Sequence, residues 1–68
     1  MSRIRINGEK KSLDVSTVDE LLRAEAVDPA ARFVAVAING EVIPRGRWDS
    51  ERVKDGDDVE IVRPAPGG

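Results

Sequence analysis

The residues whose types favour chemistry are the two that close the sequence, Gly67 and Gly68. Because glycine has no Cβ atom, a Gly-Gly end can enter a channel that is too narrow for any side chain. The carboxylate of Gly68 would then be open to conversion into an acyl adenylate by a partner enzyme. Replacement of the adenylate by sulfide would leave a thiocarboxylate, a soft nucleophile carried on the protein. The alternative is a frayed or truncated end, since chain ends are commonly disordered.

Two prolines precede these glycines, Pro64 and Pro66. Each fixes its own φ and biases the preceding residue toward extended geometry. We therefore expect residues 64–68 to form an extended, partly flexible tail, which loses less entropy when a partner binds it. Pro64 alone would end a preceding strand, so Pro66 favours a positioned arm.

The composition argues against a self-contained enzyme. With 68 residues, 40% of them apolar, the chain can build one small domain, a sheet packed on a helix, without a large polar pocket. The absence of cysteine and histidine removes the thiolate nucleophile, the imidazole proton shuttle and the commonest metal ligands. A cluster of three aspartates, Asp55, Asp57 and Asp58, does not have the full spacing of a calcium-binding loop. We interpret these aspartates as turn formers. We expect a non-enzyme without a metal.

The charges are mixed along the chain. Eleven basic and thirteen acidic residues leave a formal charge of -2, which indicates neither nucleic-acid nor membrane binding. The sequence shows no apolar signal segment and no run long enough to span a membrane. We expect a cytoplasmic protein that is a monomer on its own.

The first half of the sequence predicts a hairpin and a helix. Residues 3–6 and 10–15 alternate between polar and apolar types around Asn7-Gly8, the strongest two-residue hairpin signal. Thr17 and Glu20 form a capping box, so a helix is expected from there to about Ala26.

The second half predicts three further strands. Residues 33–38 are a continuous apolar run, typical of a strand that is covered on at least part of both faces. Asn39-Gly40 then predicts a hairpin with residues 41–43. Residues 45–53 show no clear period, and we expect Trp48 to anchor them against the domain through a single helical turn. The final strand is expected over 59–62.

The order of these elements predicts an α+β fold, a mixed sheet of four to five strands with one main helix, formed by residues 1–63. In the β-grasp version of this order, the first and last strands are parallel neighbours. The sequence resembles the ThiS-type sulfur carriers, small β-grasp proteins related to ubiquitin. The resemblance runs from Ile4 to Gly68 and rests on these pieces: Thr17-Val18, Leu21-Leu22, Ala35-Val36-Ala37-Ile38-Asn39, Val42-Ile43-Pro44-Arg45, Trp48, Asp55-Gly56-Asp57 and Gly67-Gly68.

The resemblance implies a set of partners. An E1-like adenylating enzyme (ThiF-like) would use ATP and magnesium to form the acyl adenylate on Gly68, with no cofactor bound to the chain itself. A cysteine desulfurase would supply the sulfur, and a thiazole synthase (ThiG-like) would accept it from the thiocarboxylate. Two alternatives remain open: the same chemistry for molybdopterin, a tRNA base or a specialised metabolite, and a ubiquitin-like module that only binds non-covalently. Residues 64–66 depart from the aliphatic residues that the family often has there.

The candidate partner-binding residues lie near the expected tail. If Val59 and Ile61 face the helix, Val62 faces the other way. It then joins Phe33, Ala35 and Ala37 in an exposed apolar patch. We expect this patch to dock the activating enzyme and the acceptor synthase. Further candidates are Arg63, at the root of the tail, and Arg45 with Arg47, near Trp48. The alternative is that these are solvated surface charges.

Overall fold

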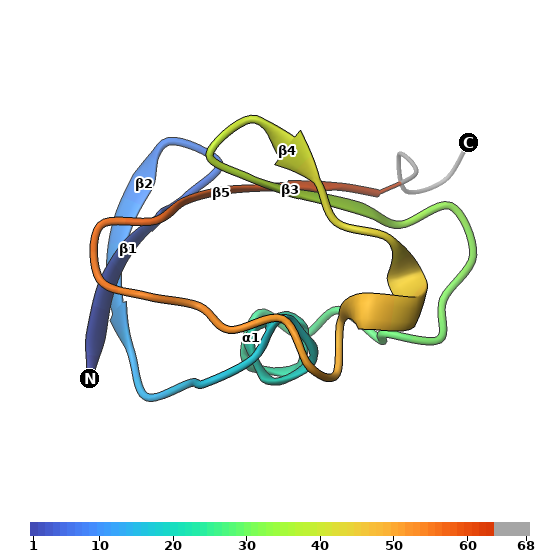
Figure 1. The fold of residues 1–68 in the computed structure, drawn as a ribbon, viewed down its shortest axis with the longest axis horizontal. Coiled ribbons are helices and arrows are strands. Elements are labelled where there is room, and N and C mark those ends of the chain that lie inside the picture. Colours follow the sequence, from blue (N-terminus) through green and yellow to red (C-terminus); the bar gives the residue numbers. More distant parts are fainter. Residues whose placement is uncertain (64–68) are drawn as a thin grey trace.

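The computed structural model describes residues 1–63, and the predicted tail, 64–68, lies outside the described residues. Five strands and one helix are arranged as a mixed sheet with the helix on one face (Figure 1). The elements are β1 (Ser2–Ile6), β2 (Glu9–Leu13), α1 (Val18–Ala24), β3 (Ala35–Ile38), β4 (Glu41–Val42), the 3₁₀ turn η1 (Arg45–Arg47) and β5 (Asp58–Val62). The strand order is β2-β1-β5-β3-β4.

The last strand is the centre of the sheet. β5 pairs parallel with β1, through Ile6 opposite Val59, and antiparallel with β3, through Val36 opposite Ile61. The predicted α+β fold, with its first and last strands as parallel neighbours, is therefore confirmed.

Both predicted Asn-Gly turns form, and both asparagines also bind β5. Asn7 and Asn39 have positive φ values of 50° and 52°, as a tight hairpin turn of this kind requires. The Asn7 side chain accepts a hydrogen bond from the Ile61 amide at 2.8 Å, and the Asn39 side chain accepts one from the Asp58 amide at 2.9 Å. Each turn asparagine thus ties its hairpin to the central strand.

The helix begins at the predicted capping box. Thr17 Oγ1 accepts a hydrogen bond from the Glu20 amide at 3.3 Å. The Glu20 carboxylate reaches back one residue further than expected, to the Ser16 amide at 2.7 Å. Ala26, at a φ of 60°, ends the helical path close to the predicted position. Lys11 joins the helix end to β2 through an ion pair with Glu25 at 2.9 Å.

The core fills the space between the sheet and α1. Its fully buried side chains include Leu21 and Leu22 from the helix, which pack against Val36 and Val59 from the sheet. Trp48 is 3% exposed and donates its indole hydrogen to the Ile43 carbonyl at 2.8 Å. The predicted anchoring of this segment by Trp48, beside a short helical turn, is confirmed.

The third strand is shorter than the predicted range of residues 33–38. β3 begins at Ala35, because Phe33 has a φ of 64°, which no β-strand residue adopts. Val36 and Ile38 are buried, whereas Ala35 is exposed and Ala37 is half-buried. One side of β3 therefore faces the core, and the other side is only partly covered.

Candidate functional site

The face of the sheet opposite α1 carries the predicted apolar patch. Along β5, Val59 and Ile61 are buried and Val62 is 60% exposed, so the predicted alternation is confirmed. Val62 pairs with exposed Ala35 on β3. Val42, 71% exposed on β4, lies opposite Ala37 and extends the same open face. A row of small and medium apolar side chains thus lies exposed on β5, β3 and β4.

Phe33 lies just before this patch. Its side chain is 79% exposed, and its φ of 64° is unusual for a bulky residue. Such a backbone conformation costs of order 1–2 kcal/mol. The strained φ together with the exposed aromatic ring makes Phe33 a candidate binding position.

Arg45 holds the loop that presents Phe33. Its guanidinium donates hydrogen bonds to the carbonyls of Pro29 and Ala31, the latter at 2.7 Å. The same guanidinium lies over the Trp48 ring, 4.6 Å from its centroid. Arg45 and residues 29–33 together line a shallow hollow of about 620 Å³. The exposed loop is thereby attached to the buried tryptophan.

Arg47 and Arg63 differ from Arg45 in their contacts. Arg47 pairs with Glu51, four residues further along the chain. Arg63 is exposed directly after β5, at the point where the tail begins. The tail candidates Pro66, Gly67 and Gly68, including the carboxylate predicted to react, lie outside the described residues.

Asp55 and Asp57 form the predicted turn, whereas Asp58, predicted to belong to the same turn, is the first residue of β5. Asp57 is 8% exposed, and its carboxylate accepts hydrogen bonds from the Lys54 amide at 2.8 Å and from Asn39 Nδ2 at 3.1 Å. Asp55 accepts one from the Arg3 amide at 2.7 Å. Within residues 1–63, no group of three acidic side chains is placed to hold a metal ion.

Two features of the site were not predicted from the sequence. The contacts of Arg45 join residues that are fourteen and sixteen positions apart, and no local pattern indicates them. A cluster of cations on the β1–β2 hairpin was also missed, although its signal was present. The two-residue turn at Asn7-Gly8 fixes the register, which places Arg5 opposite Lys10.

A five-stranded mixed sheet, with one helix across one face and an exposed apolar patch on the other, defines a ubiquitin-like protein of the β-grasp type. The crystal structure of ThiS, a thiamine biosynthesis protein from Geobacter metallireducens, superposes with a TM-score of 0.78 at 39% identity, over 97% of this chain and 99% of the other. The NMR structure of a thiamine biosynthesis protein from the same organism gives a TM-score of 0.77, over 97% and 87% of the two chains.

The sequence comparisons give the family. The model of the ThiS family matches residues 4–68, and the chain belongs to this family. The sulfur carrier protein ThiS of Escherichia coli (strain K12) is 38% identical over 52 residues, 76% of each chain. A thiazole synthase of Paramagnetospirillum magneticum is 40% identical over 67 residues, which are 97% of this chain and 20% of that protein. The chain thus spans a fifth of the length of that thiazole synthase. Within residues 1–63, no helix is long and apolar enough to cross a membrane.

Proposed function

We propose that this chain is a sulfur carrier whose Gly68 carboxylate is adenylated and then converted to a thiocarboxylate, which donates sulfur for thiazole formation in thiamine biosynthesis. The observation that carries the proposal is the match to the ThiS family, which extends over residues 4–68 and includes both closing glycines. The 38% identity to the E. coli sulfur carrier supports the same role. The chain acts as a protein co-substrate, and its partners supply the catalysis.

The proposed chemistry takes place at one carboxylate. An oxygen of Gly68 attacks the α-phosphorus of magnesium-bound ATP on a ThiF-like enzyme, which forms the acyl adenylate and releases pyrophosphate. A persulfide sulfur, derived from a cysteine desulfurase, attacks the acyl carbon and displaces AMP. A thiol of the partner then cleaves the sulfur–sulfur bond, which leaves the thiocarboxylate on Gly68 and a disulfide on the partner.

The open sheet face is the proposed docking surface for both the activating enzyme and the acceptor. Val62, Ala35 and Phe33 expose apolar surface beside the root of the tail, and Arg63 adds a positive charge there. Exposed apolar patches of this kind mark interaction sites. The thiazole synthase of P. magneticum, one fifth of which is similar to this chain, supports a ThiG-like acceptor.

An intact mass spectrum tests the carrier chemistry. The chain is incubated with a ThiF-like enzyme, magnesium, ATP, a cysteine desulfurase and cysteine. We expect a mass gain that corresponds to exchange of one oxygen for sulfur, mapped to Gly68 by fragmentation. A chain without Gly68 should show no gain. An unchanged mass, with an enzyme mixture that sulfurates another carrier, would contradict the proposal and favour a non-covalent binding module.

A substitution on the open face tests the docking surface separately. Val62→Asp places a charge in the apolar patch at an exposed position, so the domain should remain folded. We expect it to slow sulfuration through a raised KM for the carrier. Glu60→Asp, on the same face of β5, is the control and should leave the rate unchanged. A folded Val62→Asp chain that is sulfurated at the normal rate counts against the surface. Sulfur transfer from the loaded chain to a thiazole synthase then separates thiazole formation from other clients.

A further inference from the structure

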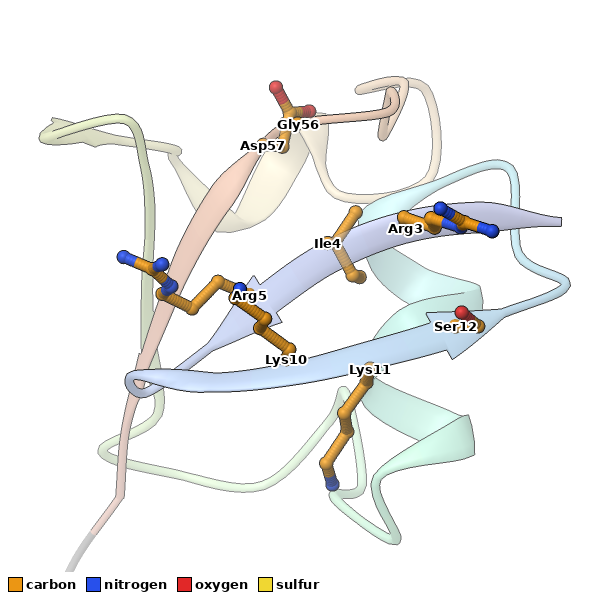
Figure 2. A pocket seen from close by; sticks show the side chains of 8 residues that line it. All are labelled: Arg3, Ile4, Arg5, Lys10, Lys11, Ser12, Gly56 and Asp57. Carbon is orange, nitrogen blue, oxygen red and sulfur yellow. The ribbon is translucent and has the colours of Figure 1, made fainter.

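The outer face of the β1–β2 hairpin carries a basic hollow of about 440 Å³. Arg3 and Arg5 on β1 alternate with buried Ile4 and Ile6, and therefore project away from α1. Lys10 on β2 lies opposite Arg5 in the register. Figure 2 shows Arg3, Arg5 and Lys10 on this hairpin, whereas Lys11 extends in the other direction, where it pairs with Glu25.

The arrangement of these cations does not stabilise the hairpin. Like charges directly opposite each other on a sheet repel, and Arg5 and Lys10 occupy such a pair of positions. Arg3, Arg5 and Lys10 form no ion pair with any residue in the described range 1–63. The outer face of the hairpin thus carries three cations without an ion-pair partner in this range, which leaves them available for an interaction outside the domain.

Acidic residues border the hollow on one side and limit what fits it. Asp58 lies beside Arg5 in the register of β5, and Asp55 accepts a hydrogen bond from the Arg3 amide. Asp57 lines the hollow, but its carboxylate is hydrogen-bonded to Asn39 and to the Lys54 amide. A long polyanion such as a nucleic acid would meet these aspartates, whereas a short acidic segment would contact only the cations.

The hollow is distinct from the apolar patch beside the tail. In the strand register, Arg5 lies opposite Asp58 at the start of β5. Val62 is four residues further along that strand. Since a strand rises by about 3.3 Å per residue, roughly 13 Å separate these two positions. Figure 1 shows the β1–β2 hairpin at one side of the sheet and the end of β5 at the other.

We propose that the outer face of the β1–β2 hairpin docks a short acidic segment of a protein partner. Charge complementarity selects the partner: Arg3, Arg5 and Lys10 attract a run of carboxylates, and the bordering aspartates exclude a larger polyanion. The contact goes beyond the carrier chemistry, since it uses neither Gly68 nor the apolar patch.

An NMR titration of the ¹⁵N-labelled chain tests the proposal, with a capped oligoglutamate peptide as the probe. We expect shift changes confined to the amides of β1 and β2, which weaken as salt is added. Lys10→Glu should weaken binding by about tenfold or more. It replaces one of the three cations by a carboxylate, which repels the acidic peptide and competes with it for Arg5. Arg52→Glu changes the net charge equally at an exposed position outside the hollow, and should bind the peptide as the parent chain does.

Thermal unfolding distinguishes an interaction role from a structural one. Lys10→Glu replaces a repulsive pair by an attractive one with Arg5, so its unfolding midpoint should rise while peptide binding falls. A fall in both would overturn the proposal, because the cations would then support the fold. Equal shift changes at basic residues across the molecule, or tighter binding of inorganic phosphate or oligothymidine than of the peptide, would also overturn it. The titration does not involve Gly68, so its failure would leave the carrier proposal intact.

Discussion

Replacement of Arg45 by alanine is expected to destabilise the domain and to loosen the loop that presents Phe33. The guanidinium makes three contacts at once: the Pro29 carbonyl, the Ala31 carbonyl and the face of the Trp48 ring. Alanine loses all three and creates no new contact. The structure therefore predicts a larger effect than an exposed loop arginine normally has.

The size of the effect follows from the contacts. A cation–π contact at an exposed site contributes about 0.5–1 kcal/mol. Each hydrogen bond of the exposed side chain adds about 0.5 kcal/mol, at the low end of the usual net range. The side-chain entropy that alanine no longer loses offsets part of the sum. We expect a net loss of about 1–1.5 kcal/mol, which lowers the unfolding midpoint of a domain of this size by roughly 4–12 °C.

Thermal and urea unfolding measure the loss, and Arg47→Ala provides the matched control. Arg47 lies on the same 3₁₀ turn, but its side chain forms an ion pair with Glu51, four residues along the chain. A pair of this kind contributes about 0.3–0.5 kcal/mol. Arg45→Lys should recover only part of the loss, because an ammonium lacks the planar fork that reaches both carbonyls.

Hydrogen exchange locates the effect. The amides of Ala30 and Ala31 are both bonded to Asp28 within the loop. They should exchange faster in Arg45→Ala, while the amides of β5 change only as far as global stability changes. If Arg45→Ala loses no more stability than Arg47→Ala, and the two loop amides keep their protection, the reasoning is refuted.

Three further predictions concern separate parts of the chain. Phe33→Asn should keep or slightly raise the unfolding midpoint, because asparagine tolerates positive φ. The same change should slow sulfuration through a raised KM, and an unchanged KM would remove Phe33 from the docking surface. Thr17→Ala should cost about 1 kcal/mol of unfolding free energy, because the Glu20 amide loses its acceptor, whereas Thr17→Ser should restore it. The pKa of Lys11 is raised because Nζ donates hydrogen bonds to Glu25. The stabilisation by this pair is therefore present below the ordinary lysine pKa and is lost as the pH rises through the raised pKa. Stability of the parent chain should therefore fall more steeply above pH 10.5 than that of Lys11→Met, and parallel curves would contradict the assignment.

The parts of the fold that were predicted from the sequence are those that local geometry decides. A hairpin that turns on Asn7-Gly8 needs two positive φ values, and few residue pairs adopt them. The Thr17 cap acts within a single helical turn, and the alternation along β5 follows from the period of a strand. The parallel pairing of β1 with β5 came from resemblance to a fold, since periodicity does not determine which strands are neighbours.

The parts that were missed depend on contacts between distant segments. The apolar run from Phe33 predicts a strand at every position, but the chain is in a left-handed conformation at Phe33, and the pairing with β5 starts at Ala35. Asp57 was correctly interpreted as a turn residue, yet its burial depends on Asn39, eighteen residues away. A sequence pattern reports what a residue prefers, whereas burial also depends on the segment that arrives opposite it.

Arg45 combines both kinds of information. From sequence it has two interpretations, a docking charge and a solvated loop charge, and the structure shows contacts that neither includes. Because its guanidinium joins the buried Trp48 to the carbonyls of the 29–31 loop, Arg45 can affect docking without touching a partner. A raised KM in Arg45→Ala alone would therefore not establish a direct contact. The double variant Arg45→Ala/Phe33→Asn separates the two roles: if Arg45 acts only through Phe33, the second change adds nothing to the KM of Phe33→Asn, and if it contacts the partner, the two effects add.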